Sequence, residues 1–234
     1  MNRYGVDAVP HLICGGFSLE ETENALIDLN FLGINNVLAL RGDARRFEDR
    51  FLPEEDGHKY AVDLVKQIAK MNKGVYLDSN LENAAPTEFS IGVAGYPEKH
   101  YEAPNFDSDL KYLKDKIDAG GEYIVTQMFF DNARFFDFVK KCRAIGITVP
   151  IIPGLKPVTR MSQLNAIPRK FFVNYPDEFV TEMNKTKDKN SARRVGIDWC
   201  IQQSKELKEK GVPCLHYYTM GDTKTMLEII KELV

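Results

Sequence analysis

The chain has 234 residues, of which 44% are hydrophobic and 28% are charged, and its formal net charge is -3. This size and composition predict one α/β domain, residues 1–234, and the charge gives no reason to expect nucleic acid or an anionic membrane as a partner. The four cysteines are widely spaced and no stretch approaches ~18 apolar residues, so we expect reduced thiols, a cytoplasmic location and no membrane span.

Helices alternate with short apolar strands along the whole chain. A first strand is predicted at residues 8–14. Ser18 and Glu21 then form a capping-box signature at the start of a helix that Gly33 ends, and the apolar run at residues 37–40 is typical of a strand buried on both faces. The same rhythm continues to the C-terminus. Further helices are predicted at about 59–71, 106–119, 132–146, 191–210 and 223–233, and further strands at 89–94, 123–125, 149–152 and 214–218.

Strict alternation of strands and helices implies a parallel sheet with right-handed crossovers, the pattern of a (βα) barrel of TIM type. A closed barrel needs eight units, and six are found here, so the predicted barrel is incomplete. Residues 161–190 depart from the rhythm and predict two short helices followed by a solvated loop at residues 185–189. Barrel chemistry lies where the strands end. The polar residues predicted there are His11, Arg41-Gly42-Asp43, Tyr96, Thr126-Gln127, Pro153-Gly154 and Tyr217-Tyr218-Thr219.

Arg41-Gly42-Asp43 follows a buried strand directly. Gly42 would let the backbone approach a ligand closely while Asp43 presents a carboxylate to it. A purely structural interpretation, in which the segment is a polar turn that caps the next element, explains these three residues about equally well. An adhesion motif is a poor alternative at the end of a barrel strand.

Three other strand-end residues suit a flat polar ligand, and each also has a structural explanation. Tyr96 precedes a proline, which favours an extended backbone and lets the ring project across a pocket. Gln127 could meet the amide-like edge of a pterin, or it could bond the backbone. His11 lies in an apolar strand, where a lone histidine is usually a satisfied core residue.

Several motifs are missing from the sequence. The first strand is followed by Cys14-Gly15-Gly16, which lacks the GxGxxG spacing of a dinucleotide-binding loop. There is no nucleophile elbow and no HExxH, and the four histidines show no metal-ligand spacing, so no metal is expected.

Taken together, the strand-end segments resemble the 5,10-methylenetetrahydrofolate reductase family, in the same order and over essentially the whole chain. The matching segments are VPHLIC at residues 9–14, NNVLALRGD at 35–43, VAGYPEKHYEA at 93–103, DLKYLKDKIDAG at 109–120, TQMFFD at 126–131, IIPGLKPV at 151–158 and HYYTM at 216–220.

The resemblance implies a βα barrel that binds FAD at its strand ends. It also implies the use of NADH or NADPH to reduce 5,10-methylenetetrahydrofolate to 5-methyltetrahydrofolate, and homo-oligomers. Asp43 and Gln127 would be catalytic, and both would also contact folate, as would Gln163. Asp43 would tune hydride transfer. The positions that match flavin-binding residues of the family are His11, Arg41, Gly42, Asp43, Ala61, Tyr96, His100, Ala103, Asp109, Tyr112 and Lys116.

Two departures from the family pattern bear on activity. Gly221-Asp222 stands where the family often has Asn-Arg, whose arginine reaches the folate tail. The first two βα units, with the glutamate that acts as general acid, have no counterpart, so we expect the chain alone to have little or no reductase activity. The alternatives are a non-catalytic flavin- or folate-binding fragment, a partner-dependent subunit, or another barrel enzyme such as a proline dehydrogenase relative or an aldolase. The lack of a strand-end lysine placed for a Schiff base counts against the aldolase.

Overall fold

A computed structural model describes residues 4–44 and 51–233. Six strands follow one another across a sheet in chain order, and the β1–β2, β2–β3 and β5–β6 pairs are parallel. The predicted fold class, a parallel α/β arrangement of TIM type with six βα units, is confirmed. The chain divides into two compact units, residues 1–94 with 112–124 and residues 95–111 with 125–234. That these units form the single predicted domain stays a prediction.

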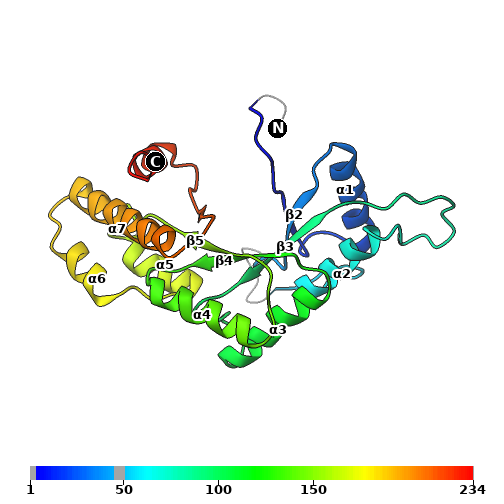
Figure 1. Cartoon of the computed structure of the whole chain (residues 1–234), viewed down its shortest axis with the longest axis horizontal. Helices are drawn as coiled ribbons and strands as arrows, with labels where there is room; N and C mark the ends of the chain where they lie inside the picture. Colours follow the sequence, from blue (N-terminus) through cyan, green and yellow to red (C-terminus); the bar gives the residue numbers. More distant parts are fainter. Residues whose placement is uncertain (1–3, 45–50, 234) are drawn as a thin grey trace. The chain divides into compact units, whose positions relative to one another are not determined.

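The first unit holds the N-terminal strands and helices (Figure 1). Its core contains the buried residues Val37, Ala39, Leu64, Ile68 and Ile91, and α2 packs against β2. Its elements are β1 (His11–Ile13), α1 (Leu19–Phe31), β2 (Asn36–Leu40), α2 (Ala61–Met71) and β3 (Ser90–Gly95), followed by the second half of α3 (Phe106–Asp118) and the start of β4 (Tyr123–Met128).

The second unit has the rest of β4 and the C-terminal elements. Helix α7 packs against α4, α6 and α8 (Figure 1). The elements are α4 (Asn132–Ala144), β5 (Ile151–Leu155), α5 (Gln163–Phe171), α6 (Asp177–Asn184), α7 (Lys189–Glu209), β6 (His216–Tyr217) and α8 (Thr223–Lys231). Its core cluster comprises Met128, Phe130, Val158, Ile167, Val173, Phe179, Met183 and Ala192.

Local sequence signals set the helix ends. The Ser18 side chain accepts a hydrogen bond from the Glu21 N–H, and the Glu21 carboxylate accepts one from the Ser18 N–H, which confirms the predicted capping box. Gly33 has a φ of +71°, so it reverses the chain after α1 in a conformation that costs other residues free energy. The two short helices predicted within residues 161–190 are confirmed as α5 and α6.

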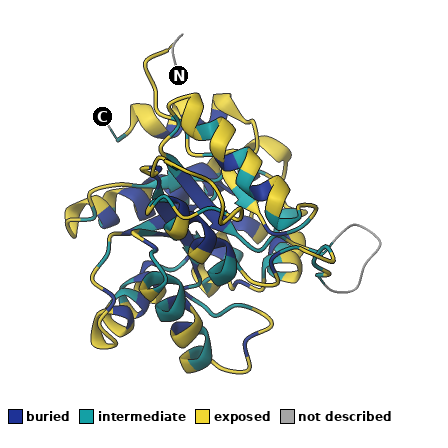
Figure 2. Cartoon of the chain, turned by 90° about the vertical axis from the view of Figure 1, so that its right-hand side faces the viewer, coloured by how far each residue is buried: buried dark blue, intermediate teal, exposed yellow. Residues whose placement is uncertain are grey.

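The strands are mostly buried, whereas the helices expose one face (Figure 2). Close backbone approaches are built into this packing. Gly92 in β3 faces the ring of Tyr123, which a Cβ at this position would overlap, and the Tyr123 hydroxyl donates to the Val37 carbonyl at 3.0 Å. Within the described residues, no helix is long and apolar enough to cross a membrane. All four cysteines are free, as predicted, and three of them are buried.

Candidate functional site at the strand ends

The loop after β3 brings four of the predicted flavin-binding residues into one connected group. The Asp109 carboxylate, in the first turn of α3, accepts a hydrogen bond from the His100 N–H at 2.9 Å. The rings of His100 and Tyr96 meet edge to face with centroids 4.7 Å apart. The N–H of the buried Ala103 donates to the His100 carbonyl at 3.1 Å. His100 therefore contacts three residues that the family resemblance assigns to the same ligand.

The same loop holds a strained lysine at its turn. Lys99 has a φ of +99°, a conformation that costs a residue with a side chain about 1–3 kcal/mol. Its ammonium group donates to the carbonyls of His100 at 3.0 Å and Ala103 at 2.6 Å, which offsets part of that strain. Strain of this kind concentrates at ligand sites, because the surrounding contacts hold the backbone ready for the ligand.

The end of β2 is fixed to the end of β1. The Cys14 N–H donates to the carbonyls of Leu40 and Arg41, both at 3.1 Å, and the thiol donates to the Leu40 carbonyl at 3.3 Å. Burial raises the pKa of the Cys14 thiol from 9.0 to about 12, so this thiol is neutral and acts as a donor. Gly42 has a φ of +89°, which is the reason for glycine in the Arg41-Gly42-Asp43 segment.

Around this turn, the Arg41 guanidinium lies 5.1 Å from the centre of the Phe51 ring, a cation–π contact. The Asp43 side chain is exposed, and within the described residues it makes no hydrogen bond or ion pair. Among the described residues, the turn therefore presents an exposed carboxylate without an ion-pair partner, two positions after an arginine whose guanidinium lies over an aromatic ring.

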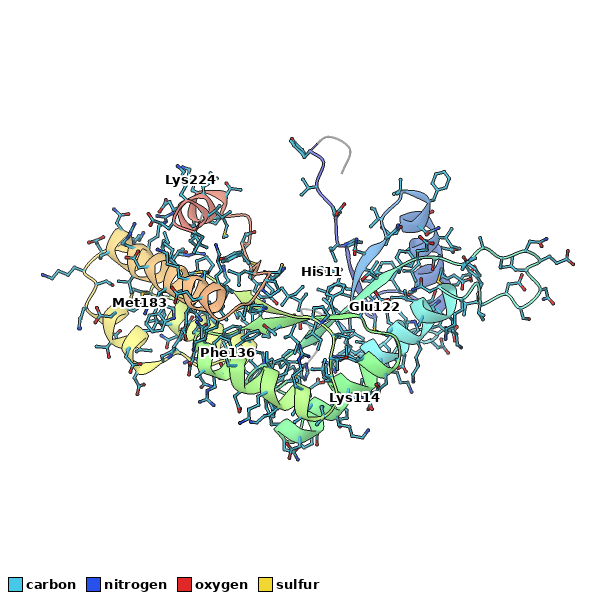
Figure 3. The ribbon with its side chains drawn as sticks, viewed as in Figure 1. His11, Lys114, Glu122, Phe136, Met183 and Lys224 are labelled. Carbon is cyan, nitrogen blue, oxygen red and sulfur yellow. The ribbon has the colours of Figure 1, made fainter. Side chains whose placement is uncertain are left out.

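Four other predicted flavin-binding residues have different environments. Lys116, on α3, donates from its ammonium group to the Ala94 carbonyl at 2.6 Å, which places a positive charge at the end of β3. Ala61 is the first residue of α2, and Tyr112 is exposed on α3. His11 is the exposed first residue of β1 (Figure 3), level with Leu38, whereas the carboxyl end of the strand is at residue 13, so the predicted strand-end placement of His11 is wrong and its role in flavin binding stays a prediction.

The two predicted substrate glutamines lie in the second unit, and both have their carbonyl oxygen occupied by backbone N–H groups. Gln127, half-buried in β4, accepts from the Met128 N–H at 2.9 Å. Gln163 begins α5 and accepts from the N–H groups of Thr159 at 2.7 Å and Arg160 at 3.0 Å. Within the described residues, neither side-chain NH₂ group has an acceptor. Each glutamine can therefore donate to a ligand.

Hydrogen bonds to the buried residue Thr126 connect β4 to β5 and to the residue that follows β6. The Thr126 hydroxyl accepts from the Gly154 N–H at 2.9 Å, and the Tyr218 hydroxyl donates to the Thr126 carbonyl at 2.8 Å. A Cβ at Gly154 would overlap both partners. Burial raises the pKa of Tyr218 to about 12, so this phenol stays protonated as a donor.

Sequence reasoning missed Lys156, which directly follows β5. Burial lowers its pKa and Arg160 lowers it further, while Asp222 and Cys200 oppose the shift. The argument that no strand-end lysine is present was therefore wrong. The signal was available in the sequence, because Lys156 stands inside the apolar run Ile151–Val158. The case against an aldolase must rest on other grounds.

Two hollows of the second unit lie along α7, and the lining of the smaller one includes Phe130 and Asp131, just past the end of β4. A cavity of about 440 Å³ and another of about 250 Å³ flank α7 and share Gln202 and Glu206 in their linings. The smaller one also borders Asn132 and Gln203, whose side chains bond each other at 3.2 Å and are held by further hydrogen bonds. Among the described residues near the strand ends, Gln127 and Gln163 have side-chain NH₂ groups without an acceptor and Asp43 has a carboxylate without a donor, so we take the strand ends as the candidate site. Among the described residues, no group of three or more His, Cys, Asp or Glu side chains could hold a metal ion.

Parallel strands in chain order, with polar and aromatic groups where the strands end, define this chain as a (βα) barrel-type protein whose candidate site lies at the carboxyl edge of the sheet. Comparison with known proteins gives the family. The family model for methylenetetrahydrofolate reductase matches residues 1–234, and the chain belongs to this family.

The similar relatives differ in how much longer they are than this chain. Methylenetetrahydrofolate reductase 2 of Saccharomyces cerevisiae is 38% identical over 98% of the chain, which spans 37% of that protein. Methylenetetrahydrofolate reductase (NADH) 1 of Zea mays is 35% identical over 99% of the chain, which spans 39% of it. The 5,10-methylenetetrahydrofolate reductase of Pectobacterium carotovorum is 34% identical over 94% of the chain, which spans 67% of that protein. The chain thus corresponds to less than half of the first two relatives.

A solved structure shares the fold. An uncharacterized protein from Clostridium thermocellum, which binds two copies of 5-methyl-5,6,7,8-tetrahydrofolic acid, matches with a TM-score of 0.60. The match covers 100% of this chain and 74% of that protein at 16% identity, so it shows the fold alone.

Proposed function

We propose that this chain takes part in the NAD(P)H-dependent reduction of 5,10-methylenetetrahydrofolate to 5-methyltetrahydrofolate, with FAD as its cofactor. The observation that carries the proposal is the loop after β3, in which Tyr96, His100, Ala103 and Asp109 form one hydrogen-bonded and ring-stacked group. The match of the family model to the whole chain supports the same reaction.

The donor set fits FAD in its chemistry. Arg41 and Lys116 offer cations near strand ends for a diphosphate, and the aromatic rings of the loop after β3 offer surfaces for flat groups. When bound, FAD would accept a hydride from the reduced nicotinamide and deliver it to the folate. The residues that we propose to hold it are His11, Arg41, Gly42, Asp43, Ala61, Tyr96, His100, Ala103, Asp109, Tyr112 and Lys116.

The chain's own polar groups then orient the substrate. Gln127 and Gln163 have their carbonyl oxygens fixed by backbone N–H groups, so each would present an NH₂ donor to a carbonyl or ring nitrogen of the pterin. Gln127 would also donate to the nicotinamide carboxamide. Asp43 would place a fixed negative charge beside the reacting groups, which favours the departure of hydride over the accumulation of further negative charge.

We also propose the reductant, the cellular location and the oligomeric state. Relatives named for NADH and for NADPH both match, so either nucleotide is a candidate reductant. We propose a cytoplasmic location because all four cysteines are free, and a homo-oligomeric state by analogy with the family.

Titration with FAD tests the proposal. The purified chain should bind FAD saturably, with quenching of flavin fluorescence. Asp109→Asn should weaken binding by about tenfold, the loss expected when a hydrogen bond to a charged acceptor is weakened. Asp118→Asn is the matched control, because Asp118 lies on the same helix in an exposed ion pair with Lys114. Absence of saturable binding by the wild-type chain would overturn the proposal, as would equal affinities of wild type and Asp109→Asn.

A further inference from the structure

A second set of contacts ties the loop after β3 to the connection between α5 and α6, across 76 residues of sequence. Both carboxylate oxygens of Glu98 lie 3.1 Å from the backbone nitrogen of Asn174, whose N–H donates to them. The Asn174 side-chain NH₂ also donates to Glu98 Oε2. A carboxylate is an acceptor-only group, so it suits a site in which every partner is an N–H donor.

An aromatic stack reinforces this pair. The rings of Tyr101 and Phe172 are nearly parallel, with centroids 4.9 Å apart and an interplanar angle of 15°. Phe172 ends α5 in the left-handed conformation, with a φ of +55°, and Lys99 has a φ of +99°. Thus both segments joined by the stack contain a residue other than glycine in a conformation that its own backbone disfavours. The aromatic stack and the Glu98–Asn174 hydrogen bonds join these two segments.

The two segments carry different parts of the proposed site. Glu98 and Tyr101 flank His100, which is joined to Asp109 and Tyr96. On the other side, Tyr175 follows Asn174 directly, and its hydroxyl donates to the backbone carbonyl of Gln163 at 3.2 Å. Three residues within four positions, Phe172, Asn174 and Tyr175, therefore connect the flavin-side loop to the first residue of α5.

We propose that Glu98 is a positioning residue: its hydrogen bonds to Asn174 make the geometry of the loop after β3 and that of helix α5 depend on each other. In this role Glu98 would act through Asn174 and would contact neither cofactor nor substrate. This role of Glu98 rests on the proposed function, which gives the loop after β3 its flavin contacts and gives Gln163 its folate contact. If Glu98 has this role, loss of its carboxylate weakens the binding of both FAD and the folate.

The first test needs no ligand. Amide hydrogen exchange of the full chain should become faster in Glu98→Gln at residues 98–103 and also at residues 172–175, although only the first segment contains the substitution. Glu23→Gln is the matched control, because the Glu23 carboxylate likewise accepts a hydrogen bond from a distant backbone N–H, that of Leu77, at 2.8 Å. The control should leave both segments unchanged. Unaltered exchange at residues 172–175 in Glu98→Gln would overturn the inference.

The second test measures the two ligands separately. In Glu98→Gln the dissociation constants for FAD and for 5-methyltetrahydrofolate should each rise by about tenfold, as expected for the loss of a hydrogen bond to a charged acceptor. The double variant Glu98→Gln with Asn174→Asp should restore both, because the glutamine NH₂ can donate to the new carboxylate while its carbonyl accepts the backbone N–H. A general loss of folding would lower the melting temperature without such rescue.

The outcomes separate the two proposals. If the wild-type chain binds both ligands and Glu98→Gln binds them equally well, the positioning role is wrong and the proposed function stands. If the wild-type chain binds neither ligand, the proposed function is wrong, and the role of Glu98 in ligand binding falls with it.

Discussion

Replacement of Gly196 by alanine tests the packing that holds the β5 end in place. Gly196 is a buried residue within α7, and a Cβ there would overlap the carbonyl carbon and oxygen of Val158. Val158 is 1% exposed and belongs to the core cluster of the second unit, so neither backbone can withdraw without disturbing its neighbours. The substitution should therefore destabilise the protein even though alanine is the better helix former.

The magnitude follows from two opposing contributions. Overpacking a filled core costs about 1–3 kcal/mol, and a collision with backbone atoms belongs at the upper end of that range. Alanine in a helix interior gains about 1 kcal/mol over glycine. The net expectation is a loss of about 2 kcal/mol, which in a chain of this size lowers the melting temperature by roughly 4–8 °C.

Urea unfolding followed by circular dichroism measures this change directly. Gln202→Ala is the control, because Gln202 is exposed on the same helix and should change stability by less than about 0.5 kcal/mol. A Gly196→Ala protein as stable as wild type, or more stable, would refute the reasoning, since it would mean that the α7 backbone does not lie against residue 158.

Three further predictions follow from individual residues. Ser18→Ala removes the hydroxyl that caps α1 and should lower the free energy of unfolding by about 1 kcal/mol in urea titrations; no change would contradict the role of the capping box. Burial raises the thiol pKa values of Cys14, Cys142 and Cys200 from 9.0 to about 12. Because the thiols of the unfolded chain ionise first, their contribution to the free energy of unfolding should be fully present below pH 9 and should be lost between pH 9 and pH 12. Urea unfolding midpoints at pH 8 and pH 10 measure this loss, and Cys200→Ala should show a smaller fall than wild type. Gln127→Ala should leave FAD affinity unchanged and weaken 5-methyltetrahydrofolate binding by about tenfold, because the half-buried side-chain NH₂ donor is lost; equal folate affinity would remove Gln127 from the proposed site.

The ends of the first helix were predictable from the sequence, because the residues that set each end lie a few positions apart. The capping box at Ser18 and the glycine stop at Gly33 each depend on residues a few positions apart. Strand bounds were harder. The fifth strand was expected to end at Ile152, before a proline, yet β5 continues through Pro153 to Leu155. The Gly154 N–H is satisfied by the Thr126 hydroxyl, a contact that no sequence window contains.

The sequence predicted the candidate site as a set of residues whose roles stay predictions, and it did not predict their geometry. The family resemblance placed Tyr96, His100 and Asp109 together, and the hydrogen bonds and ring contacts agree with that grouping. The Glu98–Asn174 pair left no sequence signal because its partners are 76 residues apart. His11 was assigned to a strand end although the predicted strand, residues 8–14, already had it at its middle, and in the structure it is the first residue of the three-residue β1.

The most direct test of the central claim is an anaerobic absorption experiment on the purified chain loaded with FAD. Addition of NADH or NADPH should bleach the flavin bands, because FAD would accept the hydride, whereas subsequent addition of 5,10-methylenetetrahydrofolate should restore them only slowly or not at all, because no described residue is assigned the role of general acid on the folate. A chain that holds FAD but bleaches with neither nucleotide would contradict the proposed reductase function, and rapid recovery of the flavin bands on addition of the folate would contradict the expectation that the chain alone has little or no reductase activity.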